Sequence, residues 1–254
     1  MAKVICVTNQ KGGVGKTTTA VNLAYYLSKD KFRTLLVDFD PQGNATSGLG
    51  FEKGELETTM TEVILGTASL EDAILNTKYK NLDLAPVTPE LANAEVEITN
   101  MQRKFVRLRD AIRKVADNYD YIIIDLPPSL SLLTVNGMIA SDYVLLPVQT
   151  EFYALEGVAQ LLESMKLVMK QANPKLQLLG VLATMYDKRT SLSLQVYEEI
   201  KKYFKGLVFK TTIPRNVRVA EAPSHGVPVG DYDKFSKGAK AYKEFTKELE
   251  ERTK

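Results

Sequence analysis

The most chemically distinctive stretch of the chain is a short run of glycines that ends in a lysine and a threonine. Residues 11–17 read Lys-Gly-Gly-Val-Gly-Lys-Thr. Glycines let a backbone curl so that successive N–H groups point toward phosphate oxygens. In such a loop the Lys16 ammonium would contact the β- and γ-phosphates of a nucleotide, and the Thr17 hydroxyl would ligate Mg²⁺. The remaining nucleotide contacts are predicted for Gly12, Gly13, Val14, Gly15 and Thr18.

The segments that flank this loop have the patterns that a phosphate-binding loop requires. Residues 4–8 are apolar or β-branched, which is typical of a buried parallel strand. Beyond the loop, apolar residues recur at helical spacing from Ala20 to Leu27. A helix that starts at the loop adds a partial positive charge there. The alternative is a purely structural glycine turn, and the strand–loop–helix order favours the phosphate loop.

Two carboxylates follow the second predicted strand, residues 33–38. Asp38 ends that strand and Asp40 comes two residues later, at the edge where parallel sheets bind their ligands. Pro41 and Gly43 predict a turn after them. Asp40 could orient an attacking water or hold Mg²⁺ through water, and the alternative is a solvated acid in a capped loop. Further polar contacts could come from Asn44, Thr46 and Ser47.

A third carboxylate, Asp125, ends the apolar stretch at residues 119–125. Hydrophobic residues followed by an aspartate form the Walker B pattern, in which the acid holds the Mg²⁺ shell directly or through water. Alone this pattern is weak. Together with the loop around Lys16 it predicts a magnesium–nucleotide site with Thr17, Asp40 and Asp125 as metal-binding residues.

The charges are nearly balanced overall but not along the chain. The sequence has 33 basic and 31 acidic residues, yet residues 184–254 hold fifteen Lys/Arg against ten Asp/Glu. This excess suggests a polyanionic partner. The single cysteine, Cys6, excludes an internal disulfide and a cysteine-rich metal site, and it is expected to be a core residue in a reducing cytoplasm. The single histidine, His225, has no neighbouring ligand residues that would indicate a metal site.

Alternating strand and helix patterns predict one α/β domain over residues 1–254, with a doubly wound, mainly parallel sheet covered on both faces. Residues 50–80 are read as a surface excursion of that domain. No signal peptide is expected, and no apolar run reaches the roughly 18 residues of a membrane span. The remaining strands are expected at residues 82–86, 143–148, 176–185 and 208–213. Helices are expected at residues 101–118, 155–171, 191–204 and 238–253.

Several strings together resemble one known group of proteins. The strict phosphate-loop pattern has a glycine where this chain has Gln10, and Lys11 is an additional lysine. This KGGVGKT variant resembles the deviant Walker A loop of the ParA/MinD group of P-loop NTPases. The segments DFDPQGNAT at residues 38–46 and DLPPS at residues 125–129 resemble switch I and switch II of ParA-type ATPases. The resemblance extends from residue 4 to about residue 226 and is to ParA/Soj-type partition ATPases.

The resemblance implies roles for individual residues. Lys11 would reach across a dimer interface to the other subunit's nucleotide, and Asp40 would be needed for slow, partner-stimulated hydrolysis of ATP to ADP and phosphate. With Lys16 these are the expected catalytic residues. Glu151 would touch the ribose across the dimer. In the strings IPRN and EAPSHG, Pro214 and Asn216 are the expected adenine contacts.

The resemblance also implies cofactors, partners and location. ATP with Mg²⁺ would close a homodimer that binds double-stranded DNA without sequence preference, through Arg189 and Arg218 with Lys188 as helper. The alternatives for the two arginines are a solvated turn residue and a charge at a helix start. A ParB-type centromere-binding protein would stimulate hydrolysis and release the dimer. The protein would be cytoplasmic and nucleoid-associated, segregating chromosome or plasmid origins.

Several other classes of protein share parts of these patterns. A membrane-cycling division-site selector is disfavoured because the polar face of the final helix mixes lysines with glutamates. An iron–sulfur carrier needs ligand cysteines that the chain lacks. No helix-turn-helix segment is expected before the first strand, which argues against operator binding. A cargo-positioning relative and a P-loop small-molecule kinase or ligase stay open as alternatives.

Overall fold

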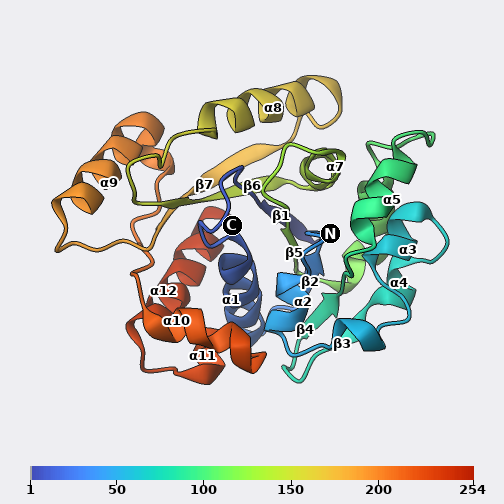
Figure 1. Ribbon diagram of the computed structural model, residues 1–254, viewed down its shortest axis with the longest axis horizontal. Coiled ribbons are helices and arrows are strands. Elements are labelled where there is room, and N and C mark those ends of the chain that lie inside the picture. The colour runs from blue at the N-terminus through green and yellow to red at the C-terminus, as the bar shows by residue number, and fades with distance from the viewer. Residues whose placement is uncertain (1) are drawn as a thin grey trace.

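The computed structural model describes residues 2–254, in which seven strands form one sheet in the order β3-β4-β2-β5-β1-β6-β7 (Figure 1). Every neighbouring pair is parallel except β3 with β4. The predicted α/β class with a mainly parallel sheet is therefore confirmed. The strands are β1 Lys3–Val7, β2 Thr34–Asp38, β3 Leu75–Asn76, β4 Leu82–Ala85, β5 Tyr121–Asp125, β6 Tyr143–Gln149 and β7 Gln177–Thr184.

Helices cover both faces of the sheet, which explains why the interior positions of the central strands β1, β2 and β5 are apolar on both faces. Val4 and Cys6 of β1 belong to one hydrophobic core, and Ile5 and Val7 belong to the other, because side chains alternate along a strand. The first core includes residues of α3 to α9, and the second includes α1 and α12. Figure 1 shows α7 and α8 on one side of the sheet and α1 and α12 on the other.

The helices vary widely in length. The long ones are α1 Lys16–Lys29, α8 Val158–Gln171, α9 Ser191–Phe204 and α12 Lys237–Arg252. Those of intermediate length are α5 Leu91–Ile98, α6 Arg107–Val115 and α7 Leu132–Ala140. The short ones are α2 Asn44–Gly48, α3 Met60–Leu65, α4 Leu70–Ala73, α10 Val217–Glu221 and α11 Val229–Tyr232. Four 3₁₀ turns complete the described elements: η1 Lys53–Glu55, η2 Ala116–Asn118, η3 Lys205–Leu207 and η4 Ala222–His225.

Two predicted elements are wrong in type or extent. Residues 208–213 form no continuous strand. They meet β7 through an isolated bridge from Val208 to Val181 and through backbone hydrogen bonds from Phe209 to Val181 and from Ile213 to Ala183, each 2.9 Å long. The reason is that the Glu248 carboxylate of α12 accepts hydrogen bonds from the backbone N–H groups of Lys210 and Thr211, at 2.8 and 3.0 Å. The helix expected over residues 101–118 begins only at residue 107, because Arg103 has a left-handed backbone conformation, φ 58°.

Residues 50–80 pack into the same molecule rather than standing apart from it. They form α3, α4 and the short strand β3, and Met60 and Ile64 of α3 are fully buried in the first core. The sequence pattern predicts neither α5 nor α7. Helix α7 is apolar along most of its length, so it lacks the helical periodicity that would have revealed it.

Candidate active site

The glycine loop connects β1 to α1 at the carboxyl edge of the sheet. Helix α1 begins at Lys16, after Gly15 in a left-handed conformation with φ 88°, and Gly13 has φ 72°. Such values favour glycine, since a side chain would add strain at both positions. The Thr184 hydroxyl at the end of β7 donates to the Val14 carbonyl at 2.8 Å and holds the loop against the sheet.

The two lysines of the loop have different surroundings. Lys16 is buried, and its Nζ donates to the Lys11 carbonyl at 3.1 Å. Burial lowers the pKa of Lys16, and the charges of Asp125 and Asp40 oppose that shift. Lys11 is only partly buried, and its backbone N–H donates to the Asn9 side chain at 3.0 Å. Lys16 therefore faces the acids within its own chain, whereas the Lys11 side chain lies nearer the surface.

Asp125 has a carboxylate that lies near the Thr17 hydroxyl but accepts no well-formed hydrogen bond from the described residues. It is completely buried, and neither of its oxygens has a hydrogen-bond partner within residues 2–254. Burial raises the pKa of Asp125 well above its usual range, and the neighbouring Asp38 charge adds to the shift, while the Thr17 hydroxyl opposes it. Buried acceptors are rarely left without a partner, so this carboxylate calls for a group that the chain itself does not supply. A divalent cation beside Thr17 fits that requirement.

Asp38 and Asp125 are directly paired residues on neighbouring strands. The Asp38 Oδ2 accepts from the backbone N–H and from the hydroxyl of Thr46, each at 2.7 Å. Burial raises the pKa of Asp38 to about 6, against the lowering effect of these hydrogen bonds. Asp40 is also buried, and its Oδ1 accepts from the Gln42 N–H at 3.0 Å. Three carboxylates thus gather at one edge of the sheet.

No cluster of three or more His, Cys, Asp or Glu side chains among the described residues could by itself hold a metal ion. This is the expected situation for Mg²⁺ at nucleotide sites, where one or two carboxylates act together with phosphate oxygens and water. His225 stacks on the Tyr232 ring with centroids 4.9 Å apart, so it packs as an aromatic side chain.

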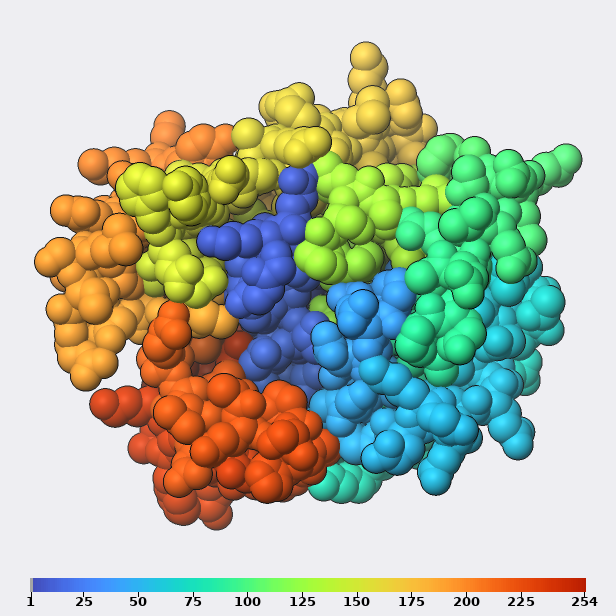
Figure 2. Space-filling model, in the orientation of Figure 1, coloured from blue at the N-terminus to red at the C-terminus, as the bar shows by residue number. Residues whose placement is uncertain are grey.

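The predicted adenine contacts share a cavity with the loop. This cavity of about 260 Å³ is lined by Gly15, Thr18, Thr184, Pro214, Asn216 and Tyr242, among others. The Asn216 side chain also caps α10, accepting from the Val219 N–H at 3.4 Å. Segments some 200 residues apart in sequence therefore meet beside the loop. Figure 2 shows the dark-blue N-terminal segment at the centre of one face, bordered by orange C-terminal and light-blue segments.

Glu151, expected to reach a ribose across a dimer, lies beside a cation of its own chain. Its Oε1 accepts from Arg215 Nη2 at 3.1 Å. The Gln149 side-chain amide also donates to the same carboxylate.

Arg189 is highly exposed, but it is paired with its neighbour Asp187. Its Nε and Nη2 donate to the two carboxylate oxygens at 2.9 and 2.7 Å. These hydrogen bonds lower the pKa of Asp187 to about 2.

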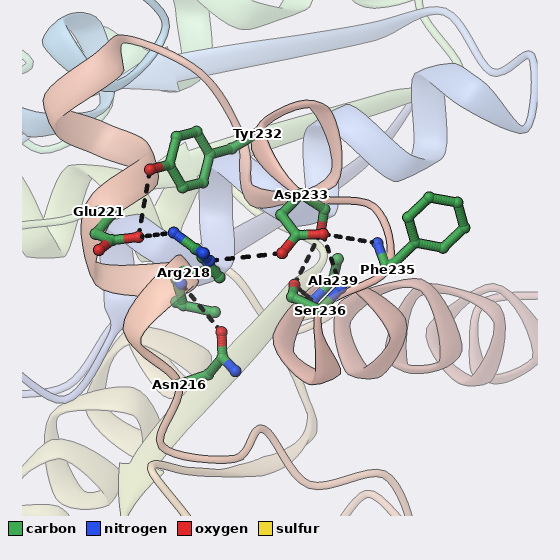
Figure 3. Close-up of polar contacts among 9 residues, drawn as sticks. Asn216, Arg218, Glu221, Tyr232, Asp233, Phe235, Ser236 and Ala239 are labelled. Carbon is green, nitrogen blue, oxygen red and sulfur yellow. Dashed lines mark hydrogen bonds and ion pairs between the residues drawn. The ribbon is translucent and has the colours of Figure 1, made fainter.

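Arg218 is held between two elements, as Figure 3 shows. Its Nη1 donates to Glu221 at 2.8 Å, and its Nε lies 3.6 Å from an Asp233 oxygen. The Tyr232 hydroxyl donates to the same Glu221 carboxylate at 3.3 Å, and the guanidinium lies 6.0 Å from the Tyr232 ring centroid. Both candidate DNA-contacting arginines are therefore ion-paired within the chain.

Three cations that were not predicted as site residues lie around the same cavity as Arg189. Lys188 and Arg189 line a cavity of about 490 Å³ together with Arg215, Lys237 and Lys240. The only sequence signal for these residues is the basic excess over residues 184–254. Their meeting depends on α12 packing beside the β7–α9 loop, which no local pattern reveals.

Comparison with known proteins identifies the family. Residues 2–178 match the family model described as an AAA domain. The sporulation initiation inhibitor protein Soj of Bacillus subtilis is 54% identical over 249 residues, which cover 98% of each chain. The chromosome partitioning protein ParA of Myxococcus xanthus is 49% identical over 252 residues, 99% of this chain and 89% of that relative. The chain belongs to the Soj/ParA family of partitioning ATPases. The predicted resemblance and the predicted ATPase class of this Soj/ParA protein are thereby confirmed.

A solved structure shows the same fold with a nucleotide. The protein described as cobyrinic acid a,c-diamide synthase from Mycobacterium smegmatis, with bound ATP analog and magnesium, matches with a TM-score of 0.91. It is 37% identical and covers 100% of this Soj/ParA chain and 96% of its own. ATP and Mg²⁺ are also what the sequence predicts here. None of the helices within residues 2–254 is long and apolar enough to cross a membrane.

Proposed function

We propose that this protein is a partition ATPase that dimerises on ATP, binds DNA without sequence preference and hydrolyses ATP to segregate chromosome or plasmid origins. The observation that carries the nucleotide part is the buried, unpartnered Asp125 carboxylate beside Thr17 and Lys16. In this proposal the backbone of residues 12–18 and the Lys16 ammonium bind the phosphates. Pro214 and Asn216 bind the adenine.

Mg²⁺ would be held by the Thr17 hydroxyl and by Asp125, directly or through water, and would neutralise charge on the phosphate oxygens. Asp40 orients the attacking water and adds to the metal shell. Lys11 of each subunit neutralises charge in the partner's site, so that two nucleotides are enclosed between two chains. Glu151 is the proposed ribose contact across the dimer, and Arg215 must release it for that role.

The cationic cavity and its neighbours support the DNA part. Arg189, Lys188 and Arg218 would contact phosphates. Arg215, Lys237 and Lys240 line the same cavity as Lys188 and Arg189, together with the acids Asp187 and Glu244. Contacts to phosphates carry no sequence information, which accounts for the proposed lack of preference. A ParB-type partner would stimulate hydrolysis and release the protein from the nucleoid.

One experiment tests these steps together. Gel filtration and a salt-titrated DNA shift are carried out on unrelated duplexes, each with and without ATP. We expect a dimer and a DNA complex only with ATP, with binding that weakens steeply as salt rises. A monomer that shifts DNA equally well without nucleotide would contradict the proposal.

The match to a structure named for a diamide synthase keeps the small-molecule ligase as a second candidate. A ligase would have no use for DNA. ATP-dependent DNA binding therefore distinguishes the two candidates. A relative that positions other cargo, such as protein clusters, would use the same steps of ATP binding, dimerisation, DNA binding and hydrolysis.

A further inference from the structure

Thr46 joins three segments of the chain through one buried hydroxyl. Its Oγ1 donates to Asp38 Oδ2 at 2.7 Å and accepts from the Val87 N–H at 3.1 Å. Its own backbone N–H donates to the same Asp38 oxygen at 2.7 Å. Thr46 and Asp38 are both completely buried. Helix α2 is therefore tied at one point to the end of β2 and to the segment that follows β4.

The turn that carries Asp40 leads directly into α2. The Gly43 N–H donates to the Asp40 carbonyl at 2.8 Å, and the Gln42 N–H donates to the Asp40 carboxylate at 3.0 Å. Gly43 precedes α2 with φ 60°, and a Cβ built there would lie 3.2 Å from the Val87 carbonyl oxygen. The backbone of Val87 therefore restricts the position of α2 in two ways, through its N–H to Thr46 and through its carbonyl beside Gly43. While Thr46 holds α2, the position of the turn at residues 40–43 is fixed as well.

The two paired carboxylates at the strand ends are used in different ways. Asp38 Oδ2 is occupied by Thr46, whereas both Asp125 oxygens are without partners in the described residues. Asp38 consequently serves as an internal acceptor for α2. Asp125 is the carboxylate that is free to act on a bound group.

We propose that Thr46 is a positioning residue for ATP hydrolysis. Through Asp38 and Val87 it fixes α2 and the preceding turn, and thereby holds the Asp40 carboxylate where it orients the attacking water. The proposal rests on the hydrolytic role proposed for Asp40. A displacement of about 1 Å in such a group can cost about a hundredfold in rate.

The test compares Thr46→Val, which keeps the shape and removes the hydroxyl, with Thr46→Ser, which keeps the hydroxyl. Single-turnover hydrolysis, affinity for a fluorescent ATP analogue and circular dichroism are measured on the full chain. We expect Thr46→Val to lower the hydrolysis rate about ten- to a hundredfold, with nucleotide affinity within about twofold of the parent. Thr46→Ser should recover most of the rate.

A background variant separates positioning from a general structural effect. If Thr46 acts through Asp40, adding Thr46→Val to Asp40→Ala should lower the rate no further. An unchanged rate in Thr46→Val, or a loss that Thr46→Ser does not recover, would overturn the proposal. So would equal losses of affinity and rate. Normal hydrolysis by Asp40→Ala alone would instead overturn the proposed function of Asp40, which keeps the two failures distinguishable.

Discussion

Two charged regions of the molecule differ in how their charges are balanced. One is the cluster of buried acids at the ends of β2 and β5, and the other is the surface that carries Arg189 and Arg218. Burial raises the pKa of Asp38 and Asp125. At the surface, hydrogen bonds from Arg189 lower the pKa of Asp187 to about 2. The buried cluster thus holds three carboxylates with the Lys16 ammonium beside them, while Arg189 and Arg218 already have carboxylate partners at the surface. A bound cation would therefore stabilise the buried acids. At the surface, a DNA phosphate would have to replace the carboxylate that already pairs with each arginine.

The two regions are also expected to change the stability of the fold in opposite directions as pH varies. The folded pKa of Asp38, about 6, lies above the ordinary aspartate value of 3.8. Its contribution to stability is therefore present at low pH and lost as pH rises through about 6. The pKa of Asp187 is lowered, so its contribution is present above its ordinary pKa and lost only as pH falls toward about 2. Changes in pH near neutrality will not release Arg189 from Asp187.

Replacing Lys16 by alanine should have the largest effect, because it removes the one cation inside the acid cluster. We expect at least about a hundredfold loss of affinity for ATP, as for a buried charge left without its partner. Titration with a fluorescent ATP analogue measures this. Lys29→Ala, at the exposed end of the same helix, is the control. Retained affinity in Lys16→Ala would remove the loop from the proposed site.

Replacing Asp40 by alanine should slow ATP hydrolysis without weakening ATP binding. ATP affinity is expected to stay near that of the parent, while hydrolysis falls by about 10²–10⁴-fold, as when a group that handles a proton or water is lost. A phosphate-release assay gives the rate. The exposed Glu57 provides the control Glu57→Ala. If hydrolysis is normal, the assignment of residues 38–46 to a switch is wrong.

Lys11→Ala tests whether the partly buried lysine acts in another subunit. Nucleotide should still bind, but ATP-dependent dimerisation should weaken about a hundredfold, since a buried interfacial charge pair is lost. Analytical ultracentrifugation with ATP reports the dimer. Lys80→Ala, at the opposite edge of the sheet, should behave like the parent. Unchanged self-association and turnover in Lys11→Ala would contradict the shared site.

Arg189→Glu should weaken DNA binding about equally for unrelated sequences and leave the dimer intact. Loss of one phosphate contact should also reduce the salt slope of binding by about one. Fluorescence anisotropy over a salt series measures both quantities. Lys166→Glu on α8 makes the same change of charge elsewhere. Equal binding by parent and Arg189→Glu at low salt would exclude this residue from the DNA surface.

The smallest expected effect concerns the carboxylate that holds Arg218. Exposed ion pairs contribute little, so Glu221→Gln should strengthen DNA binding by only about two- to threefold. The gain should vanish in an Arg218→Ala background if it comes from freeing that guanidinium. A gain of equal size in that background would mean that Glu221 acts only through its overall charge.

The boundaries of local elements could be predicted wherever one pattern decides them. Helix α9 was expected over residues 191–204 and has those bounds, and β2 was expected within one residue. The missing strand at residues 208–213 could not be predicted, because the carboxylate that takes its N–H groups comes from Glu248, about 38 residues away. The predicted arginines are exposed, but the pairing of Arg218 with Asp233, which follows α11, had no sequence signal.

The glycine loop, the apolar strands and the acids at or just after the strand ends can be recognised from local patterns, because backbone freedom and burial act over a few neighbouring residues. The pairing of Asp38 with Asp125 and the hydrogen bond from Thr46 to Asp38 follow from the three-dimensional fold alone. The fold also decided that Arg218 meets Asp233 and that Lys237 joins Arg189 at one cavity. These contacts depend on which strands are neighbours and where α12 packs, and such long-range pairings leave no periodicity in the chain.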